Sequence, residues 1–290
     1  MKTRIKIHTR LLFLSCLISF SLSLSGQNVN NEKIDGKLFI IGGGEKPESL
    51  MKEMIRTAGL QPGDYVIILP MSSEEPDSAV WYAKQDFEAI GIRNVSGMNF
   101  TENQPITSSQ IDSLSSAQLI YISGGDQTRF MKIVGKGKIY QAIHKAYHSG
   151  ATIAGTSAGA AVMSKKMLTG NSLKYPEYTG KYPTIEHDNI EITEGLGLVK
   201  NLIIDQHFIK RQRMNRLMAA SLENPDEICV GIDESTAIVV EGNMFRVTGE
   251  NQVIVLKNIK KTSKKKNNLL GGRGLVIDIL LPEEKYKFNK

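Results

Sequence analysis

The chain has 290 residues, of which 41% are hydrophobic, and it is long enough to form a stable core as one α/β domain. Its formal net charge is +6, but four positive charges lie before Gly26, so the rest of the chain carries about +2. This small excess gives no reason to expect a nucleic-acid partner. A single cysteine, Cys229, follows residue 25, which excludes an internal disulfide and a cysteine-based metal site.

The first 25 residues have the composition of a secretory signal peptide. The basic segment MKTRIKIHTR precedes an apolar run of about 15 residues, and Ser23 and Ser25 suit cleavage just before Gly26. The run is too short for a typical transmembrane helix. We therefore expect residues 1–25 to direct export, to the periplasm or out of the cell, and residues 26–290 to form a single domain with no stable membrane span. An uncleaved membrane anchor is the alternative.

After this segment, short apolar runs alternate with segments of helical spacing. This alternation predicts an α/β fold with a mostly parallel sheet and helices on both faces. In chain order, strands are expected at LFIIGGG (38–44), DYVIILP (64–70), NVSGM (94–98), AQLIYISGG (117–125) and ATIAG (151–155). The expected helices lie at 48–60, at 77–92, in SSQIDSLSSA, between residues 128 and 150, and in AAVMSKKM.

Small and polar residues gather at the ends of these expected strands. Four strands end in IGGG, ILPMSS, ISGGDQ and AGTSAG. Because parallel sheets place their sites at the carboxyl ends of their strands, we expect a site there.

The later part of the chain has a different composition. Residues 171–194, which we call the excursion, are polar with little periodicity, as is typical of a long functional or mobile loop. A strand at LIIDQHF leads into a helix within KRQRMNRLMAASLEN. The segments ICVGID, TAIVVEG, MFRVTG and QVIVLK predict an antiparallel edge of the sheet near the C-terminus. The lysine-rich segment 257–266 is interpreted as a solvated loop, with an anionic partner as the alternative.

The segment GTSAG (155–159) fits the G-x-S-x-G pattern, with an expected strand before it and a helix after it. Such a nucleophile elbow needs very small neighbours, because strand and helix approach closely. The helix N-terminus supplies positive potential and free amides near the serine. We therefore expect Ser157 to be a nucleophile. A glycine turn needed only for packing is the alternative.

An oxyanion formed at this serine would need N–H donors. We expect them from Ala158, directly after the serine, and from Gly125 and Asp126 in the neighbouring loop SGGDQ (123–127). A glycine turn without a ligand is the alternative for this loop.

A serine nucleophile needs a base, usually histidine. His207 is the best candidate, because it follows an apolar strand and so lies at the carboxyl edge where Ser157 is expected. A hydrogen-bonded core histidine is the alternative. The other four histidines lie in the signal segment, on an expected exposed helix face without metal partners, or in the polar excursion: His8, His144, His148 and His187.

The acid that would orient this base is not determined by spacing. Four carboxylates are candidates: Glu177, Glu186, Asp188 and Glu234.

Three arginines follow the candidate base, at 211, 213 and 216. Arg213 and Arg216 share one helix face. Guanidinium groups bind carboxylates in a bidentate manner, so the cluster suggests a substrate with carboxylates. Ordinary surface arginines are the alternative.

Four segments together resemble the S51 serine peptidase family, which includes cyanophycinases and α-aspartyl dipeptidases. They are SGGDQ (123–127), GTSAGA (155–160), DQHFIKRQRMNRL (205–217) and GIDESTA (231–237), and they span most of the chain after the signal segment. The resemblance implies a class I glutamine amidotransferase-like fold and a Ser-His-Glu triad. It also implies a homodimer, and no metal or other cofactor.

By position, Ser157 matches the family's nucleophile and His207 its base. Glu177 is the nearest counterpart of its triad glutamate, although NSLKYPE replaces the Gly-rich link of the family. Glu234 lies in a shared motif and stays a candidate acid, with a structural role as the alternative. The family's substrate-binding set is matched by Gln127, Asp205, Gln206, Arg211, Arg213 and Arg216.

The resemblance implies a peptide substrate. Cyanophycinases cut cyanophycin, a poly-aspartate whose side-chain carboxyls carry arginine, into β-Asp-Arg dipeptides, here through an acyl-enzyme on Ser157. One alternative is an aspartyl or isoaspartyl dipeptidase of the same family. The other is a non-catalytic exported protein that binds acidic peptides.

Overall fold

The computed structural model describes residues 36–102, 104–177 and 182–288. The expected signal segment, residues 1–25, lies outside these ranges. Residues Lys33–Lys290 form one compact unit. In the described part of the chain, no helix combines the length and the apolar character needed to cross a bilayer.

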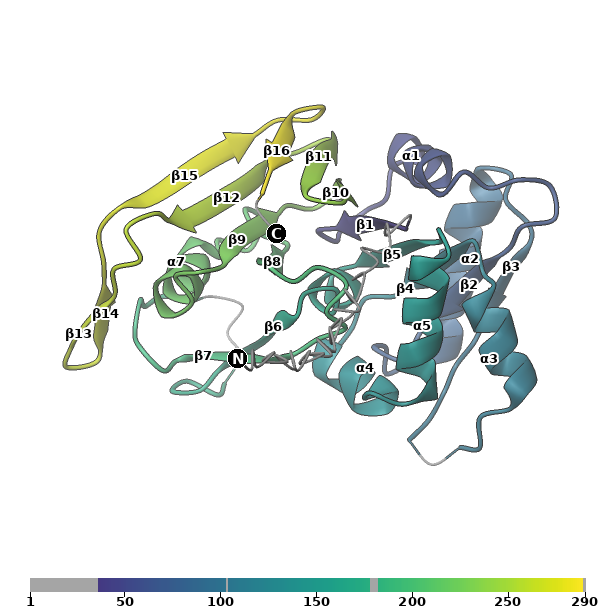
Figure 1. Ribbon diagram of the computed structural model, residues 1–290, viewed down its shortest axis with the longest axis horizontal. Helices are drawn as coiled ribbons and strands as arrows, with labels where there is room; N and C mark the ends of the chain where they lie inside the picture. Colours follow the sequence, from purple (N-terminus) through teal and green to yellow (C-terminus); the bar gives the residue numbers. More distant parts are fainter. Residues whose placement is uncertain (1–35, 103, 178–181, 289–290) are drawn as a thin grey trace, which may run out of the picture. The chain divides into compact units, whose positions relative to one another are not determined.

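The central element is an eight-stranded sheet with five neighbouring parallel strands (Figure 1). Three antiparallel strands extend it beyond β1. The mostly parallel sheet predicted from the sequence is therefore confirmed. In spatial order the strands are β16 (Lys285–Lys287), β11 (Met244–Gly249), β10 (Thr236–Glu241), β1 (Lys37–Ile41), β5 (Thr152–Thr156), β4 (Leu119–Ile122), β2 (Val66–Leu69) and β3 (Val95–Gly97).

Helices cover both faces of this sheet, because successive side chains of a strand point to opposite faces. On β1, Leu38 and Ile40 pack toward the layer of α3, α4 and α5, whereas Phe39 and Ile41 pack toward α1 and α2. The central strands β2, β4 and β5 are therefore buried along their whole length. These helices are α1 (Glu48–Ala58), α2 (Pro76–Ala89), α3 (Ser108–Ser115), α4 (Gln127–Val134) and α5 (Lys138–His148).

A second sheet of four strands lies beside the first. Its strands are β15 (Leu275–Leu280), β12 (Val253–Asn258), β9 (Ile228–Ile232) and β8 (Leu202–Gln206). The helix α7 (Met214–Glu223) packs on one face of it. The antiparallel edge predicted near the C-terminus is confirmed in part: TAIVVEG and MFRVTG extend the large sheet, whereas ICVGID and QVIVLK pair in this second sheet. Pairing partners are non-local, and a short apolar run does not specify its neighbour.

The elbow helix is shorter than expected. α6 covers only Ala158–Ala161, and the end of AAVMSKKM enters β6 (Lys166–Ser172). β6 pairs antiparallel with β7 (Ile190–Glu194), so tertiary pairing outweighs the local helical pattern. The excursion 171–194 thus begins and ends in paired strands.

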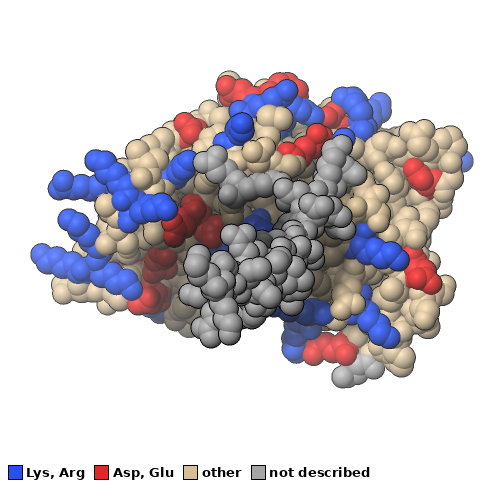
Figure 2. Space-filling model, in the orientation of Figure 1, with Lys and Arg blue, Asp and Glu red and all other residues tan. Residues whose placement is uncertain are grey.

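The lysine-rich segment also contains a strand that the sequence did not predict. β13 (Lys264–Lys266) and β14 (Leu269–Gly271) form a hairpin, and Glu186 bridges to Leu269. The lysines of β13 are exposed, and Figure 2 shows basic side chains gathered at this end of the molecule. The hairpin therefore packs against the excursion.

Candidate active site

Ser157 lies on the turn between β5 and α6. Its backbone has φ 54° and ψ −112°, a conformation that residues other than glycine rarely adopt. Such a residue costs on the order of 1–3 kcal/mol of strain, which the surrounding structure must offset. The N–H of Ser157 donates to the carbonyl of Ile41 at 3.1 Å, which holds the turn against β1.

The small residues around this serine are required by the packing. A Cβ added to Gly155 would lie 2.3 Å from the carbonyl oxygen of Gly159, and one added to Gly159 would lie 2.3 Å from that of Ile122. Both distances are far below van der Waals contact. The expectation that strand and helix approach too closely for side chains is confirmed at these two positions.

The serine, a histidine and a glutamate form a continuous hydrogen-bonded chain. Ser157 Oγ lies 2.9 Å from His207 Nε2, and His207 Nδ1 lies 2.7 Å from Glu234 Oε1. Because a carboxylate accepts hydrogen bonds, Nδ1 carries the proton and Nε2 is left to accept from the serine hydroxyl. The imidazole is buried, with 7% of its residue surface exposed.

The carboxylate beside His207 is Glu234, and the prediction of Glu177 for this place is corrected. β8 and β9 are parallel neighbours, so the turns after them, which carry His207 and Glu234, meet at one edge. Glu177 instead lines the adjacent cavity. The other candidate acids are held elsewhere: Tyr175 Oη donates to Glu186, and Asp188 pairs with His187 and Lys265.

Sequence reasoning missed the role of the glycines after β1. The N–H of His207 donates to the carbonyl of Gly42 at 2.7 Å. A Cβ on Gly43, whose φ is 108°, would lie 2.3 Å from His207 Cε1, and one on Gly44 would lie 2.7 Å from Glu234 Cβ. The glycine run was visible as a strand ending, but only the structure shows that the imidazole packs directly on it.

Two of the remaining histidines have structural partners. A ring nitrogen of His144 lies 2.8 Å from the carbonyl oxygen of Leu196, so this histidine is half-buried and not on a fully exposed face as expected. The two ring nitrogens of His187 contact Asp188 and the carbonyl oxygen of Asn267. Neither histidine faces Ser157.

Burial is the largest influence on His207 and lowers its pKa below the ordinary value of 6.5. The hydrogen bond to Glu234 acts in the opposite direction, and the positive charges of Arg211 and Arg213 lower the pKa further. The imidazole is therefore neutral at pH 7. This is the state that can accept a proton from the serine.

The expected oxyanion donors are only partly available. The N–H of Asp126 donates to the carbonyl of Ser72 at 2.8 Å, and its carboxylate caps α4 by accepting from the N–H of Thr128 at 2.7 Å. Asp126 is therefore corrected from donor to structural cap. The N–H groups of Gly125 and Ala158 have no backbone acceptor within the described ranges.

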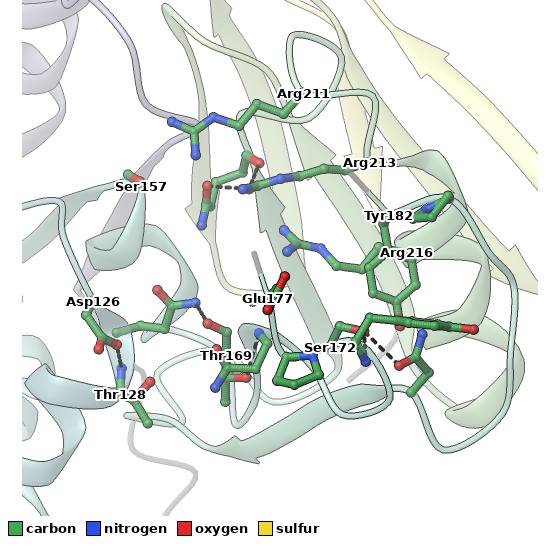
Figure 3. A pocket seen from close by; sticks show the side chains of 18 of the residues that line it. Asp126, Thr128, Ser157, Thr169, Ser172, Glu177, Tyr182, Arg211, Arg213 and Arg216 are labelled. Carbon is green, nitrogen blue, oxygen red and sulfur yellow. Dashed lines mark hydrogen bonds between the residues drawn. The ribbon is translucent and has the colours of Figure 1, made fainter. Parts of the chain in front are cut away.

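A cavity of about 600 Å³ opens beside Ser157 (Figure 3). Its volume is typical of a site for a small ligand. One wall comes from the excursion, and the other from the segments around α4 and the start of α7. The residues that line it include Gln127, Ser157, Asn171, Tyr175, Glu177, Tyr182, Gln206, Arg211, Arg213 and Arg216.

Some of the expected substrate-binding residues serve mainly to position the arginines. Asp205 is buried and accepts two hydrogen bonds from Arg216. In one of them, Arg216 Nε donates to Asp205 Oδ2 at 2.8 Å. Arg213 donates to the side chain of Gln206 at 2.7 Å. Asp205 does not line the cavity, so its expected direct contact with substrate is corrected to support of Arg216.

Gln127 lines the cavity and also ties α4 to β6. Its amide donates to the carbonyls of Leu168, at 2.9 Å, and Thr169. This contact joins the wall near Ser157 to the strand that leads into the excursion.

Residues 38–248 match the model of peptidase family S51. The cyanophycinase of Nostoc sp. is 32% identical over 225 residues, which cover 76% of this chain and 72% of that protein. The cyanophycinase of Synechococcus elongatus is 31% identical over 230 residues, with 76% and 68% covered. The crystal structure of a peptidase from an acI-B1 Actinobacterium superposes with a TM-score of 0.65 at 22% identity, covers 87% of this chain and 97% of that one, and supports the fold alone.

Replacement of Gly43 by alanine should displace the imidazole from the serine. We expect kcat to fall roughly 10²-fold, since small misplacements of reacting groups carry costs of this order. Gly59→Ala is the matched control, because Gly59 also has positive φ (64°) but a Cβ there meets nothing within 4 Å. Peptidase kinetics and thermal melts check this. Equal kcat in both variants would contradict the assigned contact.

Replacement of Arg211 by glutamine should move the acid limb of kcat/KM to higher pH. Protonated His207 cannot accept the serine proton, so activity is lost as pH falls through its pKa, which lies below 6.5 in the parent protein. Removing a nearby positive charge raises that pKa. A pH–rate profile measures the shift, with the exposed Arg273→Gln as control. A shift toward lower pH would contradict the electrostatic assignment.

Proposed function

The chain belongs to peptidase family S51, and on this premise we propose that it is a serine peptidase with a nucleophile elbow at Ser157. The observation that carries the proposal is the hydrogen-bonded chain from Ser157 through His207 to Glu234. Serine, neutral histidine and a carboxylate in this order are the groups that acyl transfer requires. The strand–helix turn at Ser157, at the carboxyl edge of a mostly parallel sheet, also supports a class I glutamine amidotransferase-like fold.

In the proposed mechanism, Ser157 Oγ attacks the carbonyl carbon of the scissile bond while His207 Nε2 takes the hydroxyl proton. Glu234 accepts from Nδ1–H and stabilises the imidazolium that forms. The amides of Gly125 and Ala158 donate to the oxyanion. The imidazolium then gives its proton to the leaving amine, and a water molecule, deprotonated by His207, hydrolyses the acyl-enzyme and restores the serine.

We propose cyanophycin as the substrate, with β-Asp-Arg dipeptides as the product. The similarity to cyanophycinases over three quarters of the chain supports this assignment. So do the three arginines that line the cavity, since their guanidiniums suit the carboxylates of such a substrate.

We further propose that the protein is exported and acts as a homodimer. The basic and apolar composition of residues 1–25 supports export, to the periplasm or beyond the cell. Edge strand β15 exposes Val276, Ile277 and Ile279, an apolar surface that a second copy would cover. Cell fractionation tests the first proposal, and light scattering of the purified protein tests the second.

Incubation of the purified protein with cyanophycin and a panel of α- and β-aspartyl dipeptides tests the substrate. We expect mass spectrometry to detect β-Asp-Arg released from the polymer. Hydrolysis of the dipeptides without attack on the polymer would instead identify an aspartyl or isoaspartyl dipeptidase.

Ser157→Ala should lower kcat at least about 10³-fold, because the nucleophile is lost, while binding of the substrate is retained. Ser96→Ala, an exposed serine on β3, is the control and should keep full activity. Steady-state kinetics and calorimetric titration measure the two effects. Unchanged turnover in Ser157→Ala would show that the nucleophile is misassigned.

A further inference from the structure

The charges of the cavity divide into groups that the protein itself neutralises and groups that it leaves without a partner. Arg216 is paired with buried Asp205, and Arg213 donates to Gln206. The guanidinium of Arg211 is different: it is exposed and forms no hydrogen bond or ion pair with the described residues. Arg211 is close enough to His207 to influence its charge, so it lies at the Ser157 end of the cavity.

The cavity is lined by two carboxylates, at Asp126 and Glu177. Asp126 is occupied as the cap of α4. The carboxylate of Glu177 is exposed and has no hydrogen bond or ion pair within the described ranges. Figure 3 shows its side chain among the cavity residues, away from Arg211 in this view. An unpartnered anion in a cavity that is otherwise rich in arginine is unexpected for a site that binds only carboxylates.

The segment that leads to Glu177 is anchored at its base. Buried Asn189 holds residues 172–174 through three hydrogen bonds: its carbonyl accepts from the N–H of Leu173 at 2.9 Å, and its side chain accepts from Ser172 Oγ and from the N–H of Lys174. Tyr175 is tied to Glu186 at 3.1 Å. Pro176 then fixes one backbone angle directly before Glu177. The glutamate is therefore presented from a positioned wall of the cavity.

We propose that Glu177 is a specificity-determining residue that binds the cationic side chain of the substrate, while Arg211 binds a carboxylate of the same molecule. The substrate class is a zwitterionic aspartyl peptide that carries a guanidinium group. A carboxylate receives a guanidinium through two parallel charge-assisted hydrogen bonds, which accounts for an anion left unpaired by the protein. This inference rests on the proposed peptidase function and assigns a separate role to a residue outside the Ser157–His207–Glu234 chain.

The test compares two synthetic β-aspartyl substrates that differ only in one charge. One carries arginine and the other citrulline, a neutral side chain of nearly the same shape. We expect the parent protein to favour the arginine substrate, and Glu177→Gln to raise KM for that substrate roughly 10–100-fold while KM for the citrulline substrate stays the same. Glu75→Gln, an exposed glutamate outside the cavity, is the control. Equal changes for both substrates, or no change, would overturn the inference.

A binding measurement separates this inference from the proposed reaction. Ser157→Ala and the double variant Ser157→Ala with Glu177→Gln are titrated calorimetrically with β-Asp-Arg and β-Asp-citrulline. A preference for arginine that depends on Glu177, without hydrolysis by the parent protein, would support the cation site and reject the peptidase. Hydrolysis with no effect of Glu177→Gln on kinetics or affinity would support the peptidase and reject the cation site. Absence of both hydrolysis and charge-dependent binding would reject both.

Discussion

The hydrogen bond between Ser157 and His207 constrains the rest of the structure, because its two residues come from different sheets. Ser157 directly follows β5 of the large sheet, and His207 directly follows β8 of the smaller one. The two ends meet only because the loop after β1 has no side chains: Gly42 accepts from the N–H of His207, and Gly43 packs under its imidazole. The 2.9 Å contact between Ser157 Oγ and His207 Nε2 therefore depends on backbone packing in three segments, which follow β1, β5 and β8.

The charges around the neighbouring cavity determine which ligands it can bind. Burial keeps the imidazole of His207 neutral, and the nearby arginines act in the same direction. Asp205 holds Arg216 in place and neutralises its charge, whereas the described residues leave the charge of Arg211 uncompensated. The proposed role of Glu177 adds an opposite charge on the wall formed by the excursion. The same cavity would then select for a molecule that carries both signs of charge.

Much of this architecture follows from local sequence patterns. Apolar runs that alternate with helical spacing predicted the parallel sheet covered on both faces, since periodicity reports burial directly. The segment around Ser157 predicted a serine on a strand–helix turn, because only glycine and alanine fit such a close approach. His207 was found by elimination and by its place after an apolar strand. Each of these inferences needs only the neighbours of a residue along the chain.

The amino-acid sequence by itself thus determined the fold class, the serine turn and the histidine. The tertiary structure alone decided which carboxylate meets that histidine, because Glu234 reaches it through the parallel pairing of β8 with β9. Glu177 was favoured only as the nearest counterpart, by position, of the glutamate that the family resemblance implies. It also decided that residues 166–172 form a strand on β7 and that the C-terminal strands divide between two sheets. Strand partners are chosen by contacts between distant segments, and no local pattern records them.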